Sequence, residues 1–171
     1  HPAEQTLRQA FRLYGHATQA FADHGNARPD ARFLDFGTGW GRIWRYFLRD
    51  FAPDHMAAFD VNPAMAGFWT SSMLGAPVDI ARPFEPLPYP DDTFDLVVSN
   101  SVFSHLSQPL NLHSARELHR VMRPGGIFVG TTFGRTHLRL WKTLAENPGD
   151  LAARQRLLAG PTRDFAPTSA D

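Results

Sequence analysis

Five apolar segments of strand type alternate with segments of helix type along the first 134 residues of the chain. The strand-type segments are short and include "FLDF" and "DLVVS". The helix-type segments carry apolar residues at the three- and four-residue spacing of one helical face. Such alternation is typical of a parallel sheet with helices on both faces. The strands are expected within 31–37, 55–61, 77–80, 93–100 and 127–133, and the helices within 3–25, 41–51, 64–74 and 107–122.

The fold class that follows is α/β, with a doubly wound, mostly parallel sheet in a three-layer α/β/α arrangement. No internal repeat, low-complexity tract or linker divides the 171 residues, so residues 1–171 are predicted to be a single domain. Residues 1–28 are expected to form an N-terminal helical cap, 31–134 the core, and 135–171 a helical C-terminal segment. No strand pattern follows Phe133.

The composition excludes several classes of function. The 17 basic side chains equal the 17 acidic ones, so no surplus of positive charge exists to bind nucleic acid or an anionic membrane. The chain contains no cysteine, which excludes disulfides and thiolate metal sites. No apolar run is long enough for a membrane span. We expect a cytoplasmic protein with no metal, no nucleic-acid partner and no membrane partner.

The segment "DFGTGWG", residues 35–41, follows the first predicted strand and is rich in glycine. Glycines at such a strand-to-helix turn let the backbone approach a ligand closely. The dinucleotide fingerprint G-x-G-x-x-G would need its third glycine at Arg42, whereas the chain has it one residue earlier, at Gly41. No Gly-Lys-Ser/Thr of a P-loop follows either. The turn is therefore predicted to be poorly suited to a pyrophosphate.

Two carboxylates accompany this turn. Asp35 stands at its start, where it would repel phosphate and attract an ammonium group. Asp60 ends the second strand, 19 residues after Gly41, where such folds bind ribose hydroxyls. Together the two acids favour S-adenosylmethionine, a nucleoside that has an α-amino group and no phosphate. The alternative is that Asp35 only caps a helix and Asp60 only ends a strand.

Four segments resemble motifs of the class I S-adenosylmethionine-dependent methyltransferases, and they cover Ala31 to Gly134 in the same order. They are "FLDFGTGWGRI", "FDVNPAM", "LPYPDDTFDLVVSNSVFSHL" and "ELHRVMRPGGIFVGTTFG". The pairing of "GWGRI" with "SVFSHL" resembles a bacterial-type subgroup that acts on small molecules or glycans. The resemblance implies a Rossmann-like methyltransferase fold. Because relatives usually continue into a sixth and a seventh strand, this chain is expected to lack the C-terminal antiparallel strands and to be truncated.

The resemblance also implies a set of cofactor-binding residues. Asp60 would hold both ribose hydroxyls, Val61 and Asn62 would lie against the adenine, and Asn100 and Ser101 would lie near the sulfonium. Many relatives have an acid for the adenine amino group at the position that Pro83 occupies here. Adenine recognition is therefore expected from backbone, from Phe84–Glu85 or from the more distant Asp79. The methionine end would contact Asp35, Gly37, Thr38, Gly39 and Gly41. Phe36 is also expected to bind the cofactor.

The predicted reaction is in-line transfer of a methyl group to an oxygen of a small-molecule or sugar acceptor. An oxygen nucleophile gains from a general base, and His105, just past the fourth strand, is the candidate. The alternative for His105 is a hydrogen bond to neighbouring backbone at a helix start. His113 and His119 are expected on a solvated helix face.

Other readings of the sequence stay open or are disfavoured. The alternative function is a catalytically inactive, cofactor-binding or regulatory domain of a larger protein. A nicotinamide oxidoreductase is opposed by Arg42 and Asp35. Amino-methylation of nucleic acid is disfavoured because Asn100 is followed by Ser101-Val102-Phe103 and not by a Pro-Pro-aromatic signature.

Overall fold

The computed structural model describes residues 2–25, 27–71, 77–132, 147 and 149. Contacts within the chain divide it into two units, His1–Thr131 and Thr132–Asp171, and all described helices and strands lie in the first unit. Nearly all of the predicted C-terminal segment 135–171 lies outside the described residues. The expected absence of further strands therefore stays a prediction.

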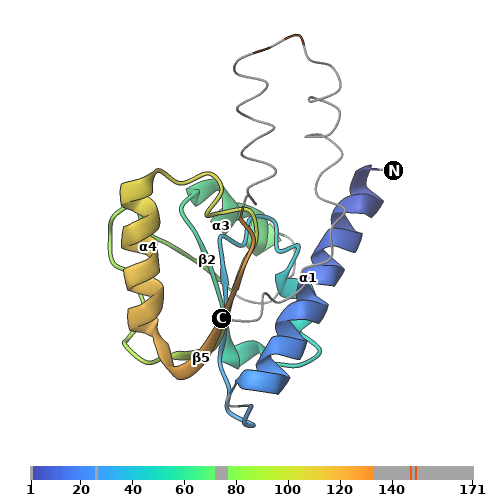
Figure 1. The fold of residues 1–171 in the computed structure, drawn as a ribbon, viewed down its shortest axis with the longest axis vertical. Coiled ribbons are helices and arrows are strands. Elements are labelled where there is room, and N and C mark those ends of the chain that lie inside the picture. The colour runs from blue at the N-terminus through green and yellow to red at the C-terminus, as the bar shows by residue number, and fades with distance from the viewer. Residues whose placement is uncertain (1, 26, 72–76, 133–146, 148, 150–171) are drawn as a thin grey trace. The chain divides into compact units, whose positions relative to one another are not determined.

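The described strands form one parallel sheet (Figure 1). Its order is β3-β2-β1-β4-β5, and every neighbouring pair is parallel. The predicted doubly wound α/β fold is confirmed. From β1 the chain moves outward to β3 and then crosses back to β4, so the order reverses between β1 and β4, where such folds bind ligands beyond the carboxyl ends of the strands. The strands are β1 (Phe33–Phe36), β2 (Met56–Asp60), β3 (Val78–Ile80), β4 (Phe94–Ser99) and β5 (Met122–Gly130).

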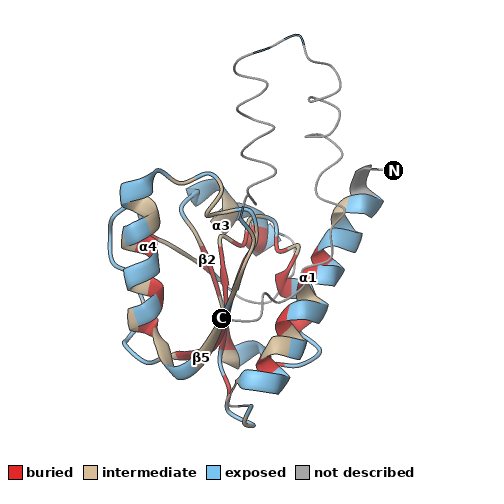
Figure 2. Cartoon of the chain, viewed as in Figure 1, coloured by how far each residue is buried: buried red, intermediate tan, exposed pale blue. Residues whose placement is uncertain are grey.

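The helices cover both faces of the sheet, with α1 and α4 on opposite sides (Figure 1). The helices are α1 (Pro2–His24), α2 (Trp44–Phe47), α3 (Pro63–Ser71) and α4 (Gln108–Val121). Figure 2 shows that the buried residues of α1 and α4 lie on the sides turned toward the sheet. All four residues of β1 are buried, as expected for a central strand covered on both faces.

Two clusters of buried side chains fill the space between the layers. The first joins α1, α2 and α3 to the sheet, and in it Phe47 stacks on Phe33 with ring centroids 4.1 Å apart. The second joins α4 to the other face, through Leu118 and Val121 packed with Leu34 and neighbouring side chains. Burial of this apolar area supplies most of the favourable free energy of folding. Within the described ranges, no helix combines the length and the apolar character that a membrane crossing requires.

Two elements differ from the sequence prediction. The helix expected over 41–51 is α-helical only at Trp44–Phe47, because Gly41 has a φ of +76° before it and the N–H of Leu48 bonds the nearby Tyr46 carbonyl after it. Residues 123–126, which lie between the helix and the strand expected from the sequence, belong to β5. There Phe94 pairs with Met122 but Leu96 pairs with Ile127, so the extra residues form a bulge.

The segment between β3 and β4 contains no described helix and is held on α4 by side-chain hydrogen bonds. Arg120 donates to the carbonyls of Leu87 at 3.0 Å and Tyr89 at 2.8 Å, and to Asp91. Glu117 accepts from the N–H of Leu87 at 2.8 Å. The hydrogen bond from Arg120 lowers the pKa of Glu117. These contacts fix the segment where it forms one wall of the cavity at the carboxyl end of the sheet.

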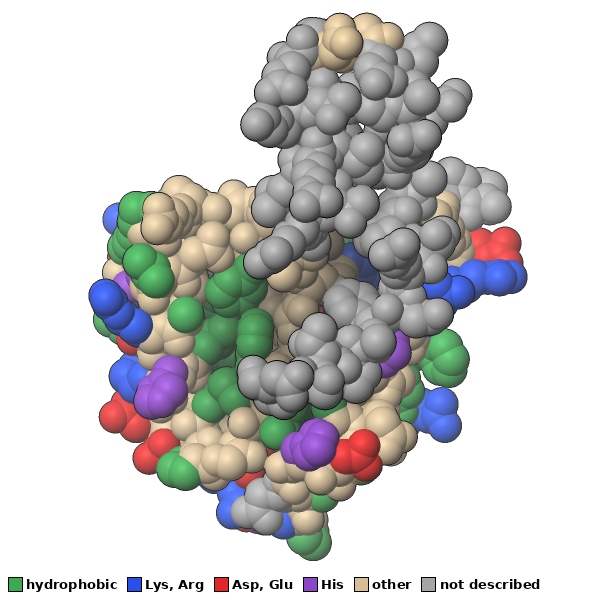
Figure 3. Space-filling model, viewed as in Figure 1, with side chains coloured by type: hydrophobic (Ala, Val, Ile, Leu, Met, Phe, Trp, Pro, Cys, Tyr) green, Lys and Arg blue, Asp and Glu red, His purple; other side chains and the backbone are tan. Residues whose placement is uncertain are grey.

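Charged side chains are mixed over the face that Figure 3 shows, with basic and acidic groups interspersed around its edge. Hydrophobic side chains gather in a hollow in the middle of this face. This mixing agrees with the equal numbers of basic and acidic residues in the sequence.

Candidate active site

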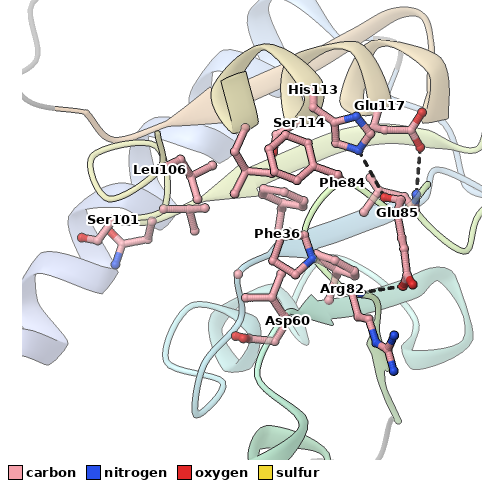
Figure 4. A pocket seen from close by; sticks show the side chains of 18 residues that line it. Phe36, Asp60, Arg82, Phe84, Glu85, Ser101, Leu106, His113, Ser114 and Glu117 are labelled. Atoms are coloured by element: carbon pink, nitrogen blue, oxygen red, sulfur yellow. Dashed lines mark hydrogen bonds between the residues drawn. The ribbon is translucent and has the colours of Figure 1, made fainter. Parts of the chain in front are cut away.

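A cavity of about 200 Å³ lies at the carboxyl ends of β1, β2 and β4, at the reversal of strand order (Figure 4). Its lining is mostly apolar, with a few polar side chains, which is typical of small-molecule sites. The lining residues come from the ends of these strands, from the segments after β3 and β4, and from α4. They are Phe36, Gly37, Phe59, Asp60, Val61, Arg82, Pro83, Phe84, Glu85, Leu87, Asn100, Ser101, Val102, Leu106, Leu110, His113, Ser114 and Glu117.

The turn after β1 is built from glycines at positive φ. Gly37 has a φ of +80°, Gly39 of +52° and Gly41 of +76°. A Cβ on Gly37 would lie 2.2 Å from Cγ2 of Val102, so any side chain there would overlap the segment after β4. A Cβ on Gly39 would meet no atom within 4 Å. The turn therefore packs closely at Gly37 and leaves open space at Gly39.

Asp60 lies in the cavity wall and holds this turn. One carboxylate oxygen accepts the N–H of Gly39 at 2.8 Å, and the other accepts the N–H of Asn62 at 2.9 Å. The indole N–H of Trp69 bonds the Gly39 carbonyl at 2.8 Å. A carboxylate at the end of β2 thus fixes the backbone of the turn after β1, and the predicted role of Asp60 toward ribose hydroxyls stays a prediction.

Asp35 lies beneath the turn rather than at its mouth. It is 1% exposed and does not line the cavity. Its Oδ2 accepts the Thr38 hydroxyl at 2.9 Å and the N–H of Trp44 at 3.1 Å, and its Oδ1 has no hydrogen-bond partner among the described residues. Burial raises the pKa of Asp35 to about 7, although these hydrogen bonds oppose the shift.

The segment after β4 is held in an unusual conformation. Ser101 has a φ of +60°, which is rare for residues other than glycine. Its N–H donates to the Thr131 hydroxyl at 2.7 Å, and that hydroxyl lies 3.4 Å from Oδ1 of Asn100. Thr131, at the end of β5, therefore braces the two residues that were predicted to lie near the sulfonium. Thr131 lies in the last of the four sequence motifs, but no role was predicted for it.

The structure brings part of the predicted site together. Predicted residues that line the cavity are Phe36, Gly37, Asp60, Val61, Phe84, Asn100 and Ser101. Predicted residues outside its lining are Asp35, Thr38, Gly39, Gly41, Asn62 and His105. Asp79 lies in a different cavity, beside Tyr89. His105 is exposed, and its N–H bonds the Val102 carbonyl at 2.9 Å, so its role as a base stays a prediction.

Helix α4 supplies four lining residues that the sequence analysis did not select, Leu110, His113, Ser114 and Glu117. His113 was expected only on a solvated helix face; it is half-buried and lines the cavity, where its ring nitrogen lies 3.2 Å from the Glu85 carbonyl. The four residues share the i, i+3, i+4, i+7 spacing of one helix face. Because only one of the four is apolar, this face has no apolar stripe that the sequence pattern could indicate.

A family model for the methyltransferase domain matches residues 34–130, which is more than half of the chain. The chain belongs to the class I S-adenosylmethionine-dependent methyltransferases. Apart from Phe33, the matched range contains all five strands β1 to β5, and it also contains the glycine turn and the whole cavity lining described above. The resemblance seen in the sequence motifs is confirmed, and S-adenosylmethionine is the cofactor of this family.

Several known proteins resemble this chain in sequence or structure. It is 35% identical over 128 residues to a malonyl-[acyl-carrier protein] O-methyltransferase of Halorhodospira halophila, covering 73% of this chain and 42% of the relative. It is 44% identical over 109 residues to the mitochondrial arginine-hydroxylase NDUFAF5 of Rattus norvegicus, covering 63% and 30%. The structure of CalS10, an amino pentose methyltransferase from Micromonospora echinaspora with bound cofactor, superposes with a TM-score of 0.58 at 20% identity, covering 75% and 51%. The chain thus spans less than half of the two sequence relatives.

Replacement of Gly37 by alanine tests the close packing of the glycine turn. A positive φ costs a non-glycine residue roughly 1–2 kcal/mol, and Gly37→Ala adds the overlap with Val102. We expect a larger loss of unfolding free energy than for Gly39→Ala, whose Cβ meets open space, measured by urea denaturation. Val102→Ala should partly rescue Gly37→Ala. Equal losses at the two glycines would contradict this account of the turn.

Asp35→Asn tests the buried carboxyl. The folded protein holds the Asp35 proton up to a pKa of about 7, against an ordinary value of 3.8, so the folded state binds more protons than the unfolded state between these values. The wild type should therefore lose stability relative to Asp35→Asn as pH rises from 4 to 7, by roughly 1.4 kcal/mol per pH unit. Urea midpoints of both proteins across pH 4–8 measure this difference. Parallel curves would show that the pKa is not raised.

Proposed function

We propose that this domain transfers the methyl group of S-adenosylmethionine to an oxygen atom of a small-molecule or sugar acceptor by in-line displacement. When bound, the cofactor supplies a methyl group that its sulfonium makes electrophilic. The observation that carries the proposal is the cavity at the strand-order reversal, with Asp60 in its wall beside the glycine turn. The relative named as an O-methyltransferase supports oxygen as the accepting atom.

The donor groups of the cavity fit a phosphate-free nucleoside. Asp60 offers carboxylate oxygens for ribose hydroxyls, and its negative charge disfavours a phosphate at the same place. Arg82 is the cationic side chain in the lining, and Figure 4 shows it extending away from the cavity. The open space beside Gly39 would suit the amino-acid end of the cofactor.

The remaining residues would position the acceptor. Asn100 and Ser101 present polar groups at the carboxyl end of β4, and Thr131 holds both in place. Phe36, Val102 and Leu106 supply apolar surface that would exclude water. Alignment of two reactants can be worth an effective molarity on the order of 10⁵ M, so positioning is the main task of such a site.

His105 would act as the general base for a hydroxyl acceptor. An imidazole has an unperturbed pKa of about 6.5, which suits proton removal near neutral pH. A carboxylate acceptor would carry its negative charge already and would need no base.

A second candidate function is a cofactor-binding domain of a longer protein that itself transfers no methyl group. It is favoured by the partial coverage of the relatives and by the 44% identity to a relative named as a hydroxylase. Binding without turnover would distinguish this candidate from the first.

Isothermal titration with S-adenosylhomocysteine tests the proposed site. The wild type should bind this probe and should not bind NAD. Asp60→Asn should weaken binding about tenfold or more, because a hydrogen bond to a charged group contributes about 1.5–3 kcal/mol. Asp54→Asn, an exposed acid before β2, is the matched control and should bind like the wild type. Preference for NAD, or no binding of the probe, would refute the proposal.

His105→Ala tests the base. With a hydroxyl acceptor, turnover should fall about 10²-fold or more while S-adenosylhomocysteine binding is unchanged. His55→Ala, on the 3₁₀ helix Pro53–His55 before β2, controls for loss of a histidine elsewhere. Full turnover by His105→Ala would remove His105 from the mechanism.

A further inference from the structure

Gly39 is held in the glycine turn by hydrogen bonds rather than by close packing. A Cβ on Gly37 would overlap Val102, whereas the side of Gly39 on which a Cβ would stand is open to 4 Å. The N–H of Gly39 donates to Asp60, and its carbonyl accepts the indole N–H of Trp69, each at 2.8 Å. These two side chains therefore fix the two peptide groups that flank the Cα of Gly39.

Trp69 belongs to α3, and this helix starts from the same carboxylate that holds the N–H of Gly39. The second carboxylate oxygen of Asp60 accepts the N–H of Asn62 at 2.9 Å. Oδ1 of Asn62 in turn accepts the N–H of Ala64, in the first turn of α3, at 3.1 Å, so Asn62 caps the helix. The chain that leaves Asp60 therefore returns through α3 to Gly39, with a hydrogen bond to this residue at each end.

The Trp69 ring is held firmly in the core. Its side chain is 2% exposed, and among the described side chains of α3 it alone is buried. It packs edge-on against Trp44, with ring centroids 5.3 Å apart and an angle of 76° between the planes. A buried indole N–H usually finds a hydrogen-bond partner, and here the partner is a backbone carbonyl of the glycine turn. A fixed donor of this kind sets the direction of the peptide group 39–40.

We propose that Trp69 is a positioning residue for the amino-acid end of the cofactor, which acts through the Gly39 carbonyl and does not touch the ligand itself. This inference rests on the proposed function. The open space beside Gly39 is where the amino-acid end would lie, so the direction of the peptide group 39–40 decides which backbone groups face that end. Trp69 is absent from the cavity lining, as expected for a residue that acts through another.

An isostere of tryptophan separates the hydrogen bond from the packing of the ring. Trp69→Phe would remove the N–H but would also leave a space in the core, whereas benzothienylalanine keeps the shape of the ring and has sulfur in place of the N–H. With benzothienylalanine at residue 69, the affinity for S-adenosylhomocysteine in isothermal titration should fall about three- to tenfold, the usual effect of losing one neutral hydrogen bond. Trp44 is the matched control, because it is equally buried and its indole N–H has no hydrogen-bond partner among the described residues. The same replacement there should leave the affinity unchanged.

A second probe distinguishes positioning from a general loss of structure. Methylthioadenosine has the nucleoside part of the cofactor and lacks its amino-acid end, so the replacement at residue 69 should leave its affinity within about twofold of the wild type. Equal losses for both probes would show that Trp69 has only a structural role, and unchanged affinity for both would show that its N–H is not needed. Either result refutes the inference while the proposed function stands. If the wild type does not bind S-adenosylhomocysteine, the proposed function fails and this inference fails with it.

Discussion

The close approach of Gly37 to Val102 is the constraint on which the site depends. The ends of β1 and β4 flank the reversal of strand order, and a side chain at residue 37 would push the following segments apart. Only glycine combines the absence of a Cβ with a φ of +80° at no steric cost. Asp60 then ties this turn to β2 through Gly39, so three central strands share one rigid edge. The cavity lies beside that edge.

Asp35, at the end of β1, is a destabilising residue at the same edge of the sheet. A buried carboxyl with one unpartnered oxygen is costly, and burial accordingly raises its pKa to about 7. Phe84 and Ser101, both at positive φ around the cavity, are two further strained positions. Phe84 and Ser101 both line the cavity, and strained backbone is common at ligand sites.

The strands, the helices and the position of Asp60 could be predicted from the sequence, because each depends on the residues next to it along the chain. The strands and their parallel order follow from the alternation of short apolar runs with helical spacing, and Asp60 follows from its place after the second strand. The bulge in β5 was missed because "RPGG" is a typical turn, and the pairing of Met122 with Phe94 is a non-local contact. The sequence did not predict that Asp35 is buried, because its burial depends on side chains that are distant along the chain. Thr131 and the α4 face with His113 were missed for the same reason, since their roles come from contacts with residues about 30 positions away.

The central claim is that a phosphate-free adenosine ligand occupies the cavity at the end of β2. A crystal structure of the protein with S-adenosylhomocysteine tests it most directly. The account predicts ribose hydroxyls within hydrogen-bond distance of the Asp60 carboxylate and the adenine against the Phe84 ring. A ligand bound elsewhere, or bound in this cavity without contact to Asp60, would contradict it.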